Sequence, residues 1–363
     1  MIKYIFFPLL ILLLINASCD NTNSEGDKNP REYTFTFDTL VSHYNSSREY
    51  QTMMNHIWGN SLDDVWASGH CSGAEDIFHY DGISWNPAQT SPAVYGGMEG
   101  EVFGFGQNNI WVVGRYGSSG DSIHGYSRIG HYDGNNWERA DIPDKTGREL
   151  LTIWGKNPND IWAGGREGTL FHYDGTEWKL YEDLELPGKA SIPGSIFNIK
   201  AIAGNDSNDI YMGTIVYYDD NEYRVSYNYL YKYENSEWNM IDSSDYTFLG
   251  NLWVSSEGNL YGGSFGFSFS IYENGDWTHL MSEYESIANI DGSSDENIFV
   301  LIWPRANSSW KLLHYNGIDF YEYEELFEID IVVQDVWTDG NEVFVTGWFD
   351  HEGVTKTLII HGK

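Results

Sequence analysis

A pattern of about 45 residues recurs along the chain, and a repeat of this length constrains the fold more than any other feature. In its clearest copy, residues 151–155 read LTIWG, residues 160–165 read DIWAGG and residues 172–178 read HYDGTEW. Two earlier copies keep the HYDG sequence and the tryptophan that follows it, at residues 79–85 and 131–137. The chain therefore consists largely of one structural unit used many times.

Later copies drift in sequence but keep an aromatic residue five positions after a tyrosine, at residues 233–238, 272–277 and 315–320. A seventh copy begins with QDVW at residues 334–337 and stops with the chain at Lys363. Each copy holds short runs of β-branched and aromatic residues separated by Gly, Asn and Asp, without helical periodicity. These features predict strands and tight turns throughout.

Four short strands in each repeat are typical of one blade of a β-propeller. The span from Thr52 to Lys363 divides into seven units of about 45 residues. We therefore predict an all-β fold, a seven-bladed β-propeller of four-stranded blades, over residues 32–363. The blades are expected at about residues 52–90, 100–143, 149–184, 197–243, 248–282, 286–325 and 331–363.

The last repeat has room for only three strands, because the chain ends just after residues 358–361 (LIIH). An alternating run, YTFTFDTL, stands at residues 33–40, ahead of the first blade. A strand in this place would complete the last blade and remove its open edge. We expect the N-terminal strand, residues 32–40, to close the ring.

Residues 1–18 have the pattern of a signal peptide. Lys3 gives a positive start, and the apolar run at residues 4–15 is shorter than the roughly 20 residues that a membrane-spanning helix needs. The NASC sequence at residues 16–19 resembles the lipobox of bacterial lipoproteins, although Asn16 stands where that motif usually carries an aliphatic residue.

The lipobox resemblance implies cleavage before Cys19 and lipidation of that cysteine. Residues 19–31 are polar and lack aromatic side chains, which is typical of a flexible tether. We expect an exported protein that is lipid-anchored in the cell envelope, at the outer membrane or cell surface. The alternative is ordinary cleavage that leaves a secreted soluble protein.

The chain is strongly acidic. It carries 20 Lys and Arg against 54 Asp and Glu, a formal net charge of −34. Such a surface argues against nucleic acid and against anionic membrane faces as partners, because phosphate binding needs clustered cations. Only two cysteines are present, so a disulfide scaffold is excluded, and Cys71 is expected to be a packed thiol.

The repeated Tyr-Asp-Gly-x-x-Trp turn resembles the Asp-box hairpin of sialidases and other propellers, although Asp and Gly are adjacent here. Whole repeats of the form NDIWAGG followed by FHYDG also look like bacterial propellers of undefined function. Independently of that likeness, Asp and Gly suit the tight turn between the third and fourth strands. The tryptophan is expected to pack between neighbouring blades.

Polar residues also recur at fixed repeat positions, and the histidines of one such position are His79, His131, His172 and His314. Equivalent positions are rotated about the propeller axis and lie far apart, so they cannot meet at one ion about 2 Å away. We predict structural roles for them, with no metal and no cofactor. Asp64, Asp160 and Asp209 are expected to form turns, with calcium as the alternative.

Ligand-binding residues are expected where the repeats differ, on the face that carries the second-to-third-strand and blade-to-blade connections. The candidates are Arg115, Tyr116, Arg166, Tyr217, Tyr218, Trp303, Arg305, Trp348 and His351. The aromatic side chains suit sugar faces or protein hot spots, or alternatively the packing of the blades. The three arginines resemble the set with which sialidases grip a carboxylate, or they pair with the surplus of acids.

These features support two functions. The first is a binding module for a glycan or an envelope protein, and we favour it because no catalytic or nucleotide-binding motif is present. The second is a sialidase-like hydrolase or lyase that acts on polysaccharide. Glycoside hydrolysis needs two carboxyl groups about 5 Å or about 6.5–9.5 Å apart, a criterion that only a structure can apply.

Overall fold

The computed structural model describes residues 33–42, 49–71, 75–88, 100–116, 126–143, 148–182, 184–185, 190, 192–205, 209–220, 223–244, 250–264, 267–281, 285–304, 310–323, 326 and 331–363. The predicted signal peptide, the predicted lipidation site Cys19 and the predicted tether lie outside these residues. Residues Glu32–Lys363 form one compact unit.

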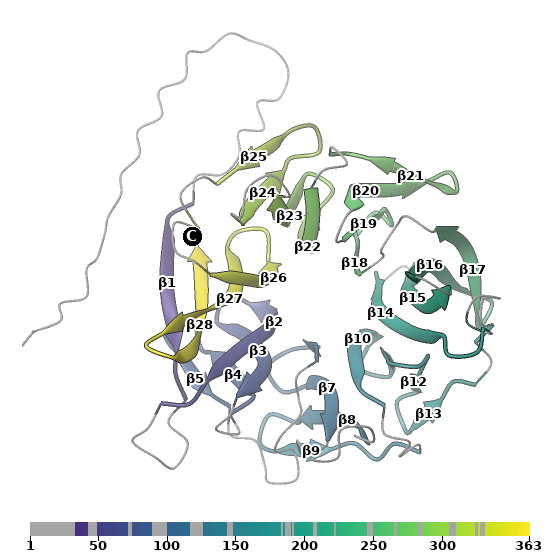
Figure 1. The fold of residues 1–363 in the computed structure, drawn as a ribbon. Coiled ribbons are helices and arrows are strands. Elements are labelled where there is room, and N and C mark those ends of the chain that lie inside the picture. The colour runs from purple at the N-terminus through teal and green to yellow at the C-terminus, as the bar shows by residue number, and fades with distance from the viewer. Residues whose placement is uncertain are drawn as a thin grey trace, which may run out of the picture. The chain divides into compact units, whose positions relative to one another are not determined.

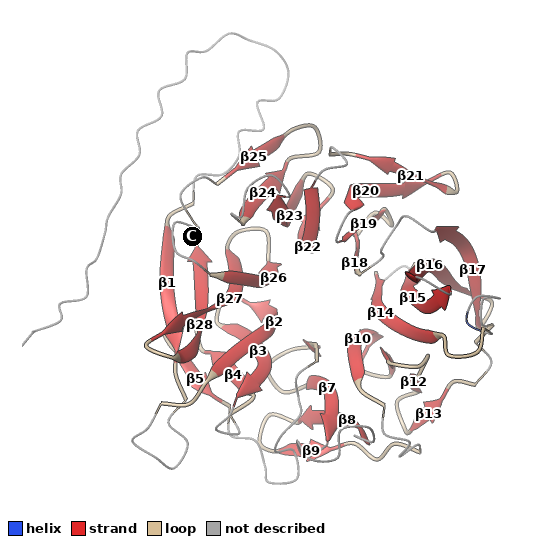
Figure 2. Ribbon diagram, in the orientation of Figure 1, coloured by secondary structure: helices blue, strands red, loops and turns tan. Residues whose placement is uncertain are grey.

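Seven antiparallel sheets of four strands each stand in a ring (Figure 1), as the repeat count predicts. The elements that the structure describes are strands (Figure 2). Within the described ranges, no helix has the length and apolar character needed to cross a membrane. The fold is therefore an all-β, seven-bladed propeller.

The first three blades follow the chain order. They contain β2 (Thr52–Ser61), β3 (Asp64–Cys71), β4 (Ile77–Tyr80) and β5 (Trp85–Pro87); β6 (Val102–Gly104), β7 (Ile110–Tyr116), β8 (Tyr126–Tyr132) and β9 (Trp137–Arg139); and β10 (Leu150–Asn157), β11 (Asp160–Gly165), β12 (Leu170–Tyr173) and β13 (Trp178–Leu180).

The next three blades repeat this order. They contain β14 (Ile196–Gly204), β15 (Ile210–Asp220), β16 (Tyr223–Glu234) and β17 (Glu237–Ser244); β18 (Asn251–Val254), β19 (Leu260–Ser264), β20 (Phe267–Glu273) and β21 (Asp276–His279); and β22 (Glu285–Ser294), β23 (Asn297–Pro304), β24 (Lys311–Tyr315) and β25 (Phe320–Glu322).

The seventh blade combines the two ends of the described chain. Its strands are β26 (Val332–Thr338), β27 (Val343–His351), β28 (Val354–Gly362) and β1 (Phe35–Leu40), with β1 outermost. Strand β1 runs antiparallel to β28, with Phe35 opposite Gly362 and Leu40 opposite Thr357. The predicted closure of the ring by the N-terminal strand is confirmed.

The turn between the third and fourth strands has the expected chemistry. In the first blade, Asp81 Oδ1 accepts the N–H groups of Ile83 and Ser84 at 3.0 and 2.8 Å, and Gly82 takes a φ of 85°. These N–H donors lower the pKa of Asp81. The same pattern recurs at Asp133, Asp174 and Asn316.

The tryptophan that follows the turn packs across the blade boundary, against an aromatic side chain of the preceding blade. Trp137 lies 6.0 Å from Trp66 of the preceding blade, and Trp178 lies 5.7 Å from Trp111, measured between ring centroids. Both Trp137 and Trp178 are buried. The predicted role of this residue between blades is confirmed, and it explains why the aromatic position persists through the repeat.

The first strands, β2, β6, β10, β14, β18, β22 and β26, line the inside of the ring and contact one another in sequence (Figure 1). One position of these strands, here called the inter-blade position, comes just before the residue equivalent to Ile57. It is occupied by His56, Glu101, Thr152, Ala201, Asn251, Asn289 and Asp335.

Three side chains at the inter-blade position, those of Asp335, Glu101 and Thr152, join successive blades by accepting a backbone N–H group. The hydrogen bonds are Ile57 to Asp335 Oδ2 at 2.9 Å, Ile153 to Glu101 Oε2 at 3.0 Å and Ile202 to Thr152 Oγ1 at 3.1 Å. Neighbouring blades are thus joined at the axis by polar contacts and farther out by aromatic packing.

Candidate functional site

Two arginines from neighbouring blades converge on one carboxylate at the loop face, the end of the ring that carries the second-to-third-strand connections. Arg166, directly after β11, donates its Nε–H to Glu149 Oε2. Arg115, in β7, places its Nε 3.8 Å from Glu149 Oε1. Both arginine side chains are about half exposed, at 52% and 54%, whereas Glu149 is 14% exposed. The guanidinium groups are therefore accessible around a largely covered acid.

Lys200 of β14 lies close enough to this group to be influenced by its charges. Burial and the positive charge of Arg166 lower the pKa of Lys200, while Glu149 and Glu101 act in the opposite direction. Among the described residues, Lys200 makes no ion pair within 4.0 Å. We call Arg115, Glu149, Arg166 and Lys200 the loop-face cluster.

A second ion pair lies on the same hairpin of the third blade. Arg148 binds Glu167, which follows Arg166 and has a φ of 55°. The N–H of Glu167 donates to Asn198 Oδ1 of the fourth blade at 3.2 Å, and Arg166 forms an isolated bridge with Asn198. These contacts hold the end of the hairpin in place beside β14.

Acidic groups near the axis are shifted toward their neutral forms. Burial raises the pKa of Glu101 to about 7, although the Ile153 N–H, the Thr152 hydroxyl and the charge of Lys200 oppose this. Burial also raises the pKa of Asp335 well above its ordinary value. His56 keeps 28% of its side chain accessible, yet burial and, less strongly, Lys200 lower its pKa to about 4.

Asp335 uses both of its oxygens for structure. Oδ2 accepts the N–H of Ile57, and Oδ1 accepts the Asn289 side-chain amide at 2.5 Å and the N–H of Val336 at 2.8 Å. Glu101 likewise holds Ile153 through Oε2. The axial carboxyl groups are thus part of the framework that joins the blades.

The predicted aromatic candidates are more enclosed than a binding platform requires. Tyr218, in β15, is buried and stacks with Tyr227 at 5.8 Å between ring centroids. Trp303 packs edge-on against Trp310 at 4.7 Å. Tyr217 and Trp348 are partly buried within β15 and β27. Packing, the alternative that the sequence leaves open, accounts for the contacts of Tyr218 and Trp303.

Three other candidates have different outcomes. His351 is exposed at the end of β27, with its ring 6.4 Å from that of Phe349. Arg305 and the side chain of Tyr116 lie outside the described residues. The structure therefore brings together Arg115 and Arg166 from the predicted set.

The repeated histidines have a structural role that the structure makes explicit. His79 stacks on Trp66, with 4.1 Å between ring centroids, and its Nε2 lies 2.8 Å from Asp64 Oδ1. The equivalent pairs are Asn109 with His131, Asp160 with His172 and Asn297 with His314. In the described part of the chain, no group of three or more His, Cys, Asp or Glu is placed to hold a metal ion.

The aspartates beside the first turn therefore do more than the sequence predicts. Asp64 accepts hydrogen bonds from Trp66 Nε1, at 2.8 Å, as well as from His79. Asp160 binds His172, and Asp209 lies 3.5 Å from the ammonium of Lys232. Their carboxylates bind side chains of the second and third strands rather than only shaping a turn.

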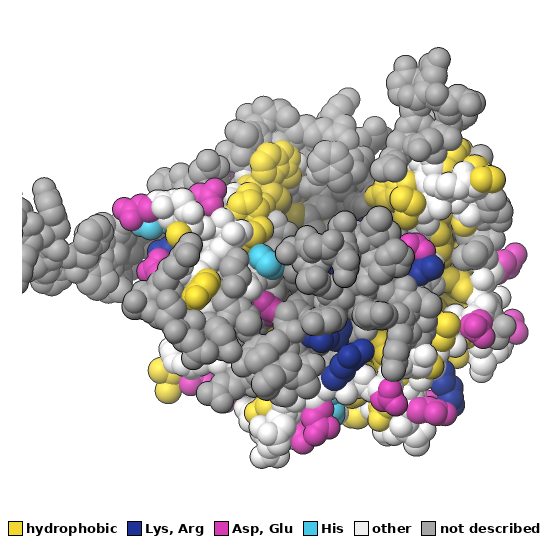
Figure 3. Space-filling model, turned by 60° about the horizontal axis from the view of Figure 1, so that its bottom comes forward, with side chains coloured by type: hydrophobic (Ala, Val, Ile, Leu, Met, Phe, Trp, Pro, Cys, Tyr) yellow, Lys and Arg dark blue, Asp and Glu magenta, His cyan; other side chains and the backbone are white. Residues whose placement is uncertain are grey.

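Glu149, Lys200 and the inter-blade residues were not predicted from the sequence. A signal was present for the latter, because a polar residue precedes the aliphatic residue of the first strand at His56, Thr152, Asn289 and Asp335. Glu149 and Lys200 carried no comparable signal, since each differs from its repeat equivalents. Figure 3 shows Lys and Arg side chains gathered near the middle of one face, with acidic side chains around them.

No protein-family model matches the chain, and no curated protein matches it. Solved propellers do match. The structure of YCF48 bound to D1 peptide has a TM-score of 0.60 and 12% identity, and the match covers 92% of this chain and 97% of that chain. YCF48 from Cyanidioschyzon merolae has a TM-score of 0.56 and 13% identity, with 88% and 98% covered.

The Niastella koreensis GH74 enzyme is also similar, with a TM-score of 0.56 and 12% identity over 84% of this chain and 53% of that chain. At such identities, the likeness to these proteins extends to the fold alone. It supports the seven-bladed architecture derived from the repeats.

Proposed function

We propose that this chain is a protein-binding module whose loop face holds a carboxylate-bearing segment of another polypeptide. The observation that carries the proposal is the convergence of Arg115 and Arg166 on Glu149, with Lys200 beside them. Guanidinium groups bind carboxylates through paired, charge-assisted hydrogen bonds, and two half-exposed guanidinium groups here retain donors for an incoming acid.

The charge distribution supports this site. The chain has a net charge of −34, so most of its surface repels an acidic segment. Within the loop-face cluster, three basic side chains face one acid, because Arg115, Arg166 and Lys200 surround Glu149. Nearby Glu101 has a pKa raised to about 7. The cluster is a local excess of positive charge, which would direct an acidic segment to this place.

A polypeptide fits this face better than a sugar does. A sugar-binding platform needs an exposed aromatic face. Here Tyr218 packs against Tyr227, and Trp303 packs against Trp310. The similar fold of YCF48 was solved with D1 peptide bound, which supports a peptide ligand for a propeller of this kind. The hydrolase alternative loses support because Asp335 engages both oxygens in structural hydrogen bonds.

A peptide-display selection tests the proposal. Random peptides are selected on the purified full chain and, in parallel, on Arg166→Gln and Arg139→Gln variants. Arg139 ends β9 on the outer part of the second blade, so its variant is a matched control for the loss of one positive charge. We expect Asp- and Glu-containing peptides to be enriched on the unmodified chain and on Arg139→Gln, but not on Arg166→Gln. Equal enrichment of neutral peptides would contradict the proposal.

We further propose that the module is exported and anchored through lipid on Cys19. The NASC sequence at residues 16–19 and the short apolar run before it support this location. Metabolic labelling with a fatty acid should label the chain and should not label a Cys19→Ala variant. Recovery of the unmodified chain from the soluble fraction, without label, would instead indicate secretion.

A further inference from the structure

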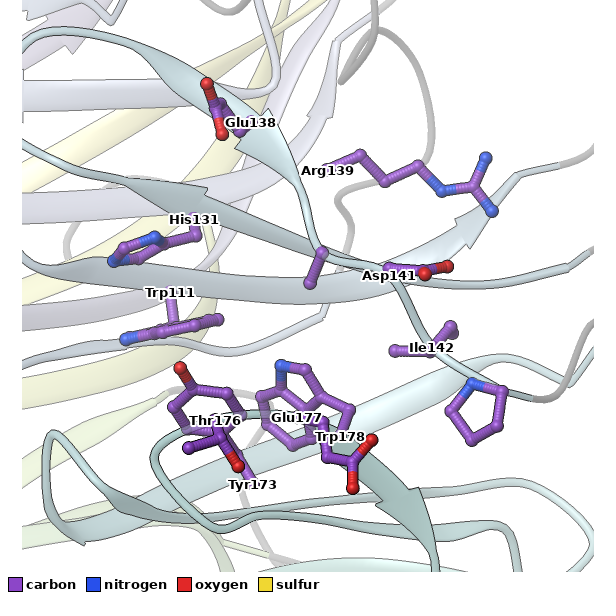
Figure 4. A pocket seen from close by; sticks show the side chains of 12 residues that line it. Trp111, His131, Glu138, Arg139, Asp141, Ile142, Tyr173, Thr176, Glu177 and Trp178 are labelled. Carbon is purple, nitrogen blue, oxygen red and sulfur yellow. The ribbon is translucent and has the colours of Figure 1, made fainter.

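A cavity of about 460 Å³ lies between the second and third blades, and none of the residues that line it belongs to the loop-face cluster (Figure 4). Its volume is within the roughly 300–1,000 Å³ range of small-molecule sites. Aromatic rings of Trp111, Tyr173 and Trp178 line it together with the polar side chains of Glu138, Arg139, Asp141 and Glu177. The combination of aromatic walls and polar groups suits a ligand that is itself amphipathic.

One wall of the cavity carries an unused hydrogen-bond donor. Trp178 is only 4% exposed, and its buried Nε1–H has no hydrogen-bond partner in the part of the chain that the structure describes. Figure 4 shows this nitrogen on the side of the indole that faces Trp111 and Ile142. A buried donor without a partner costs about 1–3 kcal/mol, so an acceptor in the cavity would be favoured.

The junction of the fourth and fifth blades shows one way in which this donor is satisfied, whereas the equivalent N–H groups of Trp85 and Trp238 lack a partner among the described residues, as that of Trp178 does. In that junction, Trp277 Nε1, equivalent to Trp178, donates to Asp242 Oδ2 of the preceding blade at 3.0 Å. Asp242 stands four residues after Trp238, just as Asp141 stands four residues after Trp137. In Figure 4, however, the Asp141 carboxylate points away from the Trp178 nitrogen. The acceptor position that Asp242 fills in one junction is therefore open in the other.

We propose that this cavity binds one neutral sugar ring. A hydroxyl or ring oxygen would accept the Trp178 N–H, while other hydroxyls would donate to the carboxylates of Glu138, Asp141 or Glu177. The C–H face of the sugar would lie against Tyr173, the partly exposed ring of the three. A cationic group offers no acceptor to Trp178, an anionic group would meet three carboxylates and one arginine, and an apolar group would leave the N–H unpaired.

Indole N–H resonances provide a direct test, with the full chain labelled at its 15 tryptophans. The Trp178 signal is assigned by its loss in Trp178→Phe. The Trp238 signal, from a repeat-equivalent N–H that also lacks a partner, is assigned in the same way and serves as the control. Methyl glycosides of glucose, galactose, mannose and N-acetylglucosamine are titrated to millimolar concentrations, and methylguanidinium and acetate are titrated as charged probes.

We expect at least one glycoside to shift the Trp178 signal in a saturable manner and to leave the Trp238 signal unchanged. Trp178→Phe should weaken binding of that glycoside about three- to tenfold, the loss expected for one hydrogen bond, while its melting temperature falls no more than that of Trp238→Phe, which shortens an equally buried ring. Trp238→Phe should bind normally. No shift with any glycoside, an equal shift at Trp238, or a larger shift with either charged probe would overturn the proposal.

Discussion

Asp335 Oδ2 lies 2.9 Å from the backbone nitrogen of Ile57, and this hydrogen bond joins the first strand of the last blade to that of the first blade. The pairing of β1 with β28 completes the last blade at the outside of the ring. The ring is therefore closed in two places. A buried carboxylate joins the last blade to the first near the axis, and a strand ladder completes the last blade at the perimeter.

Replacing Asp335 tests the axial connection. Asp335→Ala leaves the N–H of Ile57 and the amide of Asn289 without their acceptor, so we expect the free energy of unfolding to fall by about 2–3 kcal/mol. Asp335→Asn keeps one acceptor oxygen and should cost less. Urea unfolding followed by tryptophan fluorescence measures both variants. Equal losses for the two variants would show that the acceptor is unimportant.

Proline substitutions test the perimeter. Thr34 and Lys363 exchange backbone hydrogen bonds, so by strand alternation Thr36 also directs its N–H toward β28, whereas Phe37 directs its N–H away. Thr36→Pro removes a ladder hydrogen bond and should lower the melting temperature clearly more than Phe37→Pro. A larger effect at Phe37, which is 48% exposed, would contradict the register.

The repeat itself suggests which substitutions Asp160 tolerates. The second blade uses Asn109, with Oδ1 3.0 Å from His131 Nε2, where the third uses Asp160 with His172. Asp160→Asn should therefore be nearly neutral in chemical unfolding. Asp160→Ala should cost about 1 kcal/mol, the contribution of one hydrogen bond. An Asn variant as unstable as the Ala variant would show that the negative charge matters.

Glu101 should give stability a measurable pH dependence. Its pKa is about 7 in the folded protein against an ordinary value of 4.5, so between these values the folded state retains a proton that the unfolded state has lost. Its contribution therefore falls as the pH rises through this window. Glu101→Gln lacks this titration. Relative to that variant, the free energy of unfolding of the unmodified chain should fall by about 1–3 kcal/mol between about pH 5 and pH 8. Parallel stability curves would contradict the shifted pKa.

Much of the architecture could be predicted because its determinants are local in sequence. The Tyr80 to Trp85 turn motif and its five relatives mark the first six blades, and the alternating run that ends at Leu40 marks the closing strand. Packing between blades is not local. The burial of Tyr218 against Tyr227 depends on strand register, and the meeting of Arg115 with Glu149 depends on how two blades are rotated about the axis.

The difference between Asp141 and Asp242 shows the same limit within a single repeat position. Both residues stand four places after a tryptophan, yet only Asp242 caps the indole of the next blade. The two aspartates occupy the same position of the repeat, but their carboxylates point in different directions. A site that depends on such a departure from the repeat can be found only in three dimensions.

The most direct test of the loop-face proposal measures the affinity of a selected acidic peptide for Arg166→Gln and Glu149→Gln. Arg166→Gln removes a donor and should weaken binding at least tenfold, while Glu149→Gln releases Arg115 and Arg166 from their shared acid and should strengthen it. Changing the peptide's acids to amides should abolish both effects. If the two variants change affinity in the same direction, or if the amide peptide binds equally well, the loop-face cluster is not the carboxylate-binding site.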